Sequence, residues 1–170
     1  MGFGEAVSSC FSKYAVFSGR APRSELWWWF LFVILVSFGV GIISGILDVV
    51  LGLKAFSGIV SLLLDLFFLL PNLAVTMRRL HDLNRSGWWY GGLIVLSLFI
   101  MALGIPLMIR MAENHEQGYA PTDGLNPAVF ILLAVLGFAE TVYSIVLLVW
   151  FCMRGTRGPN RFGPDPLQAF

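Results

Sequence analysis

A histidine and an aspartate, His81 and Asp82, lie side by side in a charged stretch between two long apolar runs, "TMRRLHDLNRSGWW". Such a pair suggests acid–base chemistry. Neighbouring residues on a helix point about 100° apart, however, so the two side chains need not face each other. The chain has neither a recognisable Ser or Cys nucleophile motif nor a metal-binding spacing such as HExxH. We therefore predict no catalytic residue, no metal site and no cofactor, and we interpret the chain as a non-enzymatic protein.

Arginine is the more informative residue type here and in the segments that flank the first and last apolar runs. Its planar guanidinium binds carboxylates and phosphates through two parallel hydrogen bonds. One interpretation is internal: the arginines pair with Glu25, Asp82 and Asp165 and lock the helices together. The other is a site for an anionic ligand, such as the phosphate of a lipid headgroup or of a phosphorylated molecule. The candidate residues for such a site are Arg20, Arg23, Arg78, Arg79, His81, Asp82, Arg85, Arg157 and Arg161.

Two acids, Asp65 and Glu140, fall near the middle of apolar runs. A charged side chain at the centre of a bilayer costs about 2.5 kcal/mol or more, so both should face the interior of a helix bundle. One interpretation is structural, with the carboxyls hydrogen-bonded to Ser, Thr, Asn72 or Tyr143. The alternative is a path for protons or cations, which would make the protein a small transporter.

The composition indicates the solvent in which these residues lie. Of 170 residues, 58% are hydrophobic and only 12% are charged, which is about half the charged share usual for a soluble domain. The net charge of +1 gives no reason to expect a nucleic-acid partner. Such a chain is expected to lie in a lipid bilayer, which is its first predicted partner.

Four apolar runs are long enough to cross a membrane, since about 20 helical residues span the hydrocarbon core. In lipid, backbone polar groups must be satisfied within the segment, so each run should be an α-helix. We predict an all-α, single integral membrane domain over residues 1–170, with a tail at 154–170. The predicted spans are 26–50, 56–77, 88–109 and 128–153.

Basic residues are distributed unequally between the two sides that this topology creates. Nine of them precede the first span, connect the second to the third, or follow the fourth, whereas Lys54 and Arg110 lie in the other two connections. The positive-inside rule therefore places both termini, and the tail, in the cytoplasm.

The N-terminal residues have a pattern of their own. Within residues 1–19, apolar side chains recur every three or four positions, with serines and a lysine between them. This spacing predicts an amphipathic helix that is too short to span a bilayer. Two placements are open: the helix lies in the membrane interface, or it packs over the cytoplasmic end of the bundle.

The chain also contains an internal repeat. The segment after the second span, "MRRLHDLNRSG", matches the segment after the fourth, "MRGTRGPNRFG", at five of eleven positions without a gap. Both segments follow spans that run in the same direction. We therefore interpret the four transmembrane helices as two repeated hairpins, related by a pseudo-twofold axis along the membrane normal.

Three blocks near the predicted cytoplasmic face carry a family resemblance: "FSGRAPRSELWWWF", "MRRLHDLNRSGWW" and "GTRGPNRFGPDP". They resemble the signature blocks of an uncharacterised family of bacterial inner-membrane proteins, domain of unknown function 805. The resemblance extends from about Phe11 to Pro166. It implies a small integral protein of the bacterial cytoplasmic membrane, but it implies no activity and transfers no functional residue.

Together these features predict a multi-pass inner-membrane protein that binds anionic lipid headgroups, or protein partners, through its Arg-rich cytoplasmic face. Four helices bury little interior, which is compatible with a homo-oligomer or a membrane-protein partner. The alternative function is a proton- or cation-linked transporter that uses Asp65 and Glu140.

Overall fold

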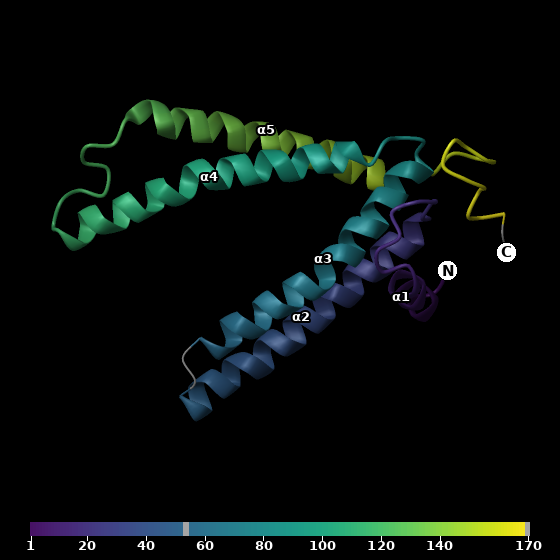
Figure 1. Ribbon diagram of the computed structural model, residues 1–170, viewed down its shortest axis with the longest axis horizontal. Coiled ribbons are helices and arrows are strands. Elements are labelled where there is room, and N and C mark those ends of the chain that lie inside the picture. Colours follow the sequence, from purple (N-terminus) through teal and green to yellow (C-terminus); the bar gives the residue numbers. More distant parts are fainter. Residues whose placement is uncertain (53–54, 169–170) are drawn as a thin grey trace. The chain divides into compact units, whose positions relative to one another are not determined.

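The computed structural model describes residues 1–52 and 55–168, and this part of the chain is all-α (Figure 1). Four of its five helices are long and apolar enough to cross a membrane, and the fifth is the short N-terminal helix. The predicted fold class is therefore confirmed. The helices are α1 (Phe3–Ser12), α2 (Arg23–Leu51), α3 (Phe56–Asp82), α4 (Trp88–Glu116) and α5 (Pro127–Cys152).

Two helices extend well past the apolar runs that predicted them. α3 continues from residue 77 to Asp82, and α4 continues from residue 109 to Glu116. The added residues are mostly good helix formers, and a glycine in the left-handed conformation, Gly118, follows α4. α1 is shorter than predicted, because it ends at Ser12 and the chain is irregular from there to the start of α2. Lys54, which entered the prediction of orientation, lies outside the described residues.

The chain forms two compact units. Unit 1 contains α1, α2, α3 and the chain from Phe151 onward, and unit 2 contains Trp88–Trp150. In unit 1, α1 packs against α2 and α3, with Ala6 and Cys10 completely buried. Of the two placements that the sequence left open, the structure shows α1 packed against other helices.

A proline explains how the N-terminal segment attaches to α3. Pro71 lies inside the helix and has no N–H, so the carbonyl of Phe67, four residues earlier, loses its usual intrahelical donor. The hydroxyl of Tyr14 donates a hydrogen bond to that carbonyl. One residue further on, the Trp29 indole N–H of α2 donates to the side-chain oxygen of Asn72 at 2.7 Å. The donor that Pro71 lacks thus leaves an acceptor for Tyr14, and the Asn72 side chain beside it provides a second one for Trp29.

Unit 2 is the hairpin of α4 and α5, with its polar contacts on facing sides of the two helices. The Tyr143 hydroxyl donates to the carbonyl of Trp89 at 2.6 Å, and the Trp89 ring meets that of Trp150 edge-on at 5.3 Å. Deeper along the pair, the Ser97 hydroxyl donates to the Glu140 carboxylate. Glu140 is therefore held by a hydroxyl on the facing helix.

Candidate functional site

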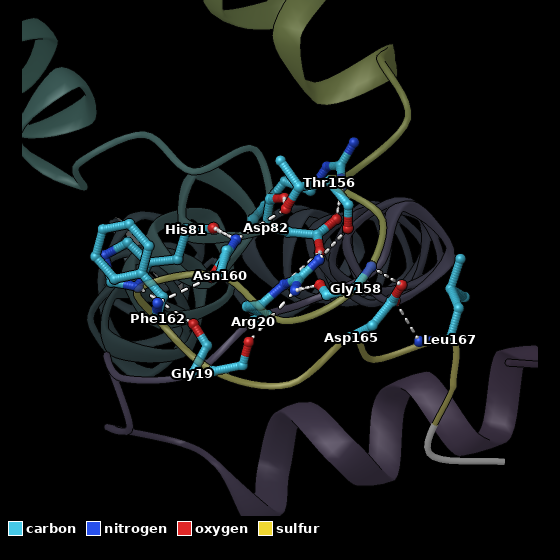
Figure 2. Close-up of polar contacts among 12 residues, drawn as sticks. Gly19, Arg20, His81, Asp82, Thr156, Gly158, Asn160, Phe162, Asp165 and Leu167 are labelled. Atoms are coloured by element: carbon cyan, nitrogen blue, oxygen red, sulfur yellow. Dashed lines mark hydrogen bonds and ion pairs between the residues drawn. The ribbon is translucent and has the colours of Figure 1, made fainter.

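Three segments that are distant in sequence meet in unit 1, where α2 begins, α3 ends and the chain leaves α5. We name this region the basic end and define it as residues 18–25, 76–87 and 151–168. Backbone hydrogen bonds join the segments. The Ala21 N–H donates to the backbone carbonyl of Arg78 at 3.0 Å, and the Thr156 N–H donates to the backbone carbonyl of Asp82 at 2.9 Å. Side chains from all three segments, among them those of Arg20, Asp82 and Asp165, therefore lie together (Figure 2).

Asp82, the last residue of α3, is the centre of the basic end. It is only 3% exposed, and its carboxylate accepts hydrogen bonds from two buried arginines. The Arg20 guanidinium reaches one carboxylate oxygen at 2.9 and 3.0 Å, and Arg79 binds the other oxygen. A buried carboxylate is tolerated only when it is paired in this way, so Asp82 and the two arginines depend on one another.

Arg20 also fastens the C-terminal tail to α3. Its two terminal nitrogens donate to backbone carbonyls of the tail, at 2.5 Å to Thr156 and 2.6 Å to Gly158 (Figure 2). A longer contact of 3.4 Å reaches Gly163. Because the same guanidinium binds Asp82, one side chain connects the linker before α2, the end of α3 and the tail.

Arg79 binds the chain where it leaves α5. Its guanidinium donates to the Phe151 carbonyl at 3.2 and 3.3 Å and also to the Met153 carbonyl. The last carbonyls of a helix lack intrahelical donors and carry the negative end of the helix dipole, so a cation is favoured there. Arg79 has no exposed surface, and its charge is shared between these carbonyls and Asp82.

The third buried arginine, Arg78, pairs with a carboxylate on α2 instead of Asp82. It lies 3.2 Å from the Glu25 carboxylate, and both side chains are almost completely buried. The Ser9 hydroxyl of α1 donates to the same Glu25 oxygen at 3.1 Å. Burial, followed by the charge of Glu25, raises the pKa of the neighbouring Cys10 thiol to about 12.

His81 and Asp82 do not form the acid–base pair that their adjacency suggested, because their side chains bind different partners. Nδ1 of His81 lies 3.2 Å from the Gly19 carbonyl and therefore carries the proton in this contact. The ring stacks face to face on Phe162 with 3.9 Å between centroids, and the His81 carbonyl accepts a 2.9 Å hydrogen bond from Asn160 (Figure 2). The geometry assigns His81 to holding the linker and the tail.

The remaining candidate arginines are closer to the surface. Arg161 is exposed, lies 4.7 Å from the centroid of the Phe162 ring and donates to the Asn84 carbonyl at 3.2 Å. Arg85 is half-buried, and its N–H donates to the Leu80 carbonyl in the turn that ends α3. Arg23 is exposed and donates to the Cys152 carbonyl at 3.1 Å.

Sequence reasoning missed three tail residues that form the site. A Cβ on Gly155 would lie 1.9 Å from an Asp82 oxygen, so only glycine lets the tail approach this carboxylate. Thr156 donates from both its N–H and its hydroxyl to the Asp82 carbonyl. Arg154 is the residue that the repeat aligns with Arg78, which was the available signal for including it.

The last turn of the tail is organised by Asp165. Its carboxylate accepts hydrogen bonds from the backbone N–H groups of Leu167 at 3.0 Å and Gly158 at 2.9 Å. These two bonds, together with the charges of Arg20 and Arg154, hold the pKa of this carboxyl below its ordinary value. The Asp165 carboxylate thus fixes the conformation of the tail by binding backbone N–H groups of the tail, and it forms no ion pair among the described residues.

Two adjoining cavities, each of about 480 Å³, open at the basic end. The first lies beside the start of α2, and the second lies over the tail. Arg23, Trp27 and Arg154 are among the residues lining the first, whereas Arg157 and Asp165 line only the second. Both share a wall formed by Asp82, Arg154, Gly155 and Leu167.

Two of the cavity arginines differ from the buried ones in their surroundings. Arg154 and Arg157 are exposed and make no hydrogen bond or ion pair with any residue that the structure describes. This contrasts with Arg20, Arg78 and Arg79, whose guanidinium groups are buried against carboxylates. The basic end therefore divides into a buried set that is ion-paired with carboxylates and an exposed set that makes no ion pair among the described residues.

The two acids of the apolar runs differ in their surroundings. Asp65, on α3 in unit 1, is exposed and has no hydrogen-bond partner among the described residues. Glu140, in unit 2, is half-buried and accepts the bond from Ser97. Within the described chain, no three His, Cys, Asp or Glu side chains lie close enough together to hold a metal ion.

Comparisons with known proteins agree with this architecture. A family model described as protein of unknown function (DUF805) matches residues 14–164. Inner membrane protein YhaI of Escherichia coli strain K12 is 32% identical over 93% of this chain and 92% of its own length. Inner membrane protein YhaH of the same strain is 30% identical over 91% of this chain and 89% of its own. No solved structure matches the chain. With four apolar helices and inner-membrane relatives, the chain is a multi-pass membrane protein.

Proposed function

The chain belongs to the DUF805 family of proteins of unknown function, and from that premise we propose that it binds anionic lipid headgroups at its basic end, without catalysing a reaction. The observation that carries the proposal is the first cavity, where Arg23 and Arg154 flank the start of an apolar helix. A phosphate between them would receive charge-assisted hydrogen bonds from both guanidinium groups.

The difference between ion-paired and unpaired arginines supports Arg23 and Arg154 as the phosphate ligands. The buried arginines already form ion pairs: Arg20 and Arg79 with Asp82, and Arg78 with Glu25. A phosphate could bind them only if these buried pairs were broken. Arg154 has no such partner among the described residues, and Arg23 makes a single hydrogen bond to a backbone carbonyl. The anionic ligand should therefore bind the exposed set.

The position of the cavity supports a lipid as the source of the phosphate. The cavity includes Trp27, an exposed aromatic residue one turn into α2, and such residues favour the headgroup level of a bilayer. Nine basic residues lie before or at the start of α2, in the last turn of α3 or its connection to α4, or after α5. By the positive-inside rule this is the cytoplasmic side, with both termini inside. The anionic lipids of that leaflet are then the nearest phosphates.

Native mass spectrometry of the protein released from membranes tests the proposal. We expect wild-type protein to retain anionic phospholipid and the Arg23→Gln/Arg154→Gln variant to retain at least tenfold less, since each charged hydrogen bond contributes about 1.5 kcal/mol or more. Arg110→Gln, at the other end of α4, is the matched control and should behave as wild type. Equal retention by wild type and the double variant, with helicity intact, would rule out this site.

A second candidate function rests on Asp65, because an acid in an apolar helix with no partner among the described residues suits a proton or cation path. Reconstituted liposomes test it. A transporter would give ion or proton flux that falls in Asp65→Asn and Glu140→Gln. The absence of flux, or flux unchanged in both variants, would leave the acids with structural roles.

A further inference from the structure

The second cavity gives the lipid-binding site a chemical preference. It shares Arg154 with the first cavity and continues from it over the tail, where Thr156, Arg157 and Gln168 are among its lining residues. The first cavity is bordered by Trp27, Pro22 and Leu167, which suit the apolar part of a lipid. A ligand whose phosphate binds Arg154 would therefore place its apolar part in one cavity and its headgroup in the other.

The charges of the second cavity decide which headgroup it accepts. Arg154 and Arg157 are both exposed and unpaired among the described residues, so an ammonium group placed there would meet two like charges. Asp82 is bound by two arginines of its own, so Asp165 is the one described acid on this wall left to offset Arg154 and Arg157, and an excess of positive charge remains. The cavity thus disfavours a cationic headgroup.

The same residues suit hydroxyl groups. Arg157 offers several N–H donors, and the Gln168 side chain offers a donor and an acceptor, whereas a hydroxyl can both give and accept a hydrogen bond. A headgroup that ends at the phosphate would not reach these side chains. We propose that the preferred ligand is a phosphodiester lipid with an uncharged, hydroxylated headgroup, that Arg154 binds its phosphate and that Arg157 selects its headgroup.

This inference rests on the proposed function, since it assumes that Arg23 and Arg154 bind the phosphate. The experiment offers the purified protein an equimolar mixture of three phospholipids with identical acyl chains and measures bound lipid by native mass spectrometry. The lipids are phosphatidylglycerol, phosphatidic acid, which lacks a headgroup beyond the phosphate, and phosphatidylethanolamine, which carries an ammonium. Wild-type protein should retain them in that order.

The variants separate binding of the phosphate from selection of the headgroup. Arg157→Gln should lower the ratio of bound phosphatidylglycerol to bound phosphatidic acid about fivefold, which corresponds to one lost hydrogen bond. Arg161→Gln, an exposed arginine that does not line either cavity, should leave the ratio unchanged. Arg23→Gln/Arg154→Gln should instead lower binding of all three lipids together.

Each contrary result points to one assumption. Equal retention of phosphatidylglycerol and phosphatidic acid by wild type, or a ratio unaffected by Arg157→Gln, overturns the headgroup assignment alone. Lipid binding unaffected by the double variant overturns the proposed function as well. A soluble competitor tests the source of the phosphate: inorganic phosphate should not displace the lipid, and displacement would assign the site to free phosphate.

Discussion

Removing the Asp82 carboxylate should release the C-terminal tail. In Asp82→Ala, the buried guanidinium groups of Arg20 and Arg79 lose their common acceptor while the rest of their surroundings stays in place. Breaking a buried ion pair from one side costs about 3–5 kcal/mol. We expect a loss in this range instead of twice it, because one carboxylate serves both arginines and each keeps backbone carbonyls as acceptors.

Limited trypsin digestion in detergent micelles measures the effect. The tail contains cleavage sites at Arg154, Arg157 and Arg161, and cleavage requires local opening. A loss of 3–5 kcal/mol raises the open population, and thus the cleavage rate, roughly 100- to 5,000-fold as long as cleavage is slower than reclosing. Asp65→Asn, an exposed acid in the same helix, is the control. A rate for Asp82→Ala within about twofold of wild type, with normal helicity, would refute the role assigned to this carboxylate.

Three further predictions concern the same region. Gly155→Ala should release the tail as Asp82→Ala does, because its Cβ would lie 1.9 Å from that carboxylate, whereas Gly137→Ala, with open space around it, should not; the trypsin assay compares them. Cys10, with its pKa raised to about 12, should resist alkylation at pH 8 in a Cys152→Ser background until the protein is denatured, as counted by mass spectrometry. The pKa of Asp165 is lowered in the folded protein, so the stability that this carboxylate contributes is present at neutral pH and is lost as the pH falls below about 3.8; the difference in tail protection between wild type and Asp165→Asn, measured by amide hydrogen exchange, should be level from pH 7 to pH 5 and should shrink only below this range.

The membrane-spanning helices were predictable because lipid imposes a length and a composition that hydropathy records directly. The predicted span 128–153 differs by one residue at each end from α5 (Pro127–Cys152). Hydropathy says less about where a helix ends in water, which is why α3 and α4 run past the predicted limits. It also missed the early end of α1, since apolar residues such as Tyr14 and Phe17 keep a helical spacing while lying in an irregular segment.

The candidate site was predictable as a place but not as a set of contacts. The distribution of arginine showed that three segments would meet, yet residue type alone could not say which arginines find a carboxylate. Arg79 and Arg157 look alike in the sequence, although one is completely buried and the other is exposed. The role of Gly155 could not be predicted at all, because it depends on the distance between the tail and Asp82 in the folded chain.

The most direct test of lipid binding at the basic end is an experimental map of the protein in lipid nanodiscs that contain phosphatidylglycerol. We predict headgroup density between the Arg23 and Arg154 side chains, with the acyl chains leaving beside Trp27. Water alone in this cavity, with both arginines turned toward bulk solvent while the ordered lipids lie elsewhere on the protein, would contradict the assignment of this end as the headgroup site.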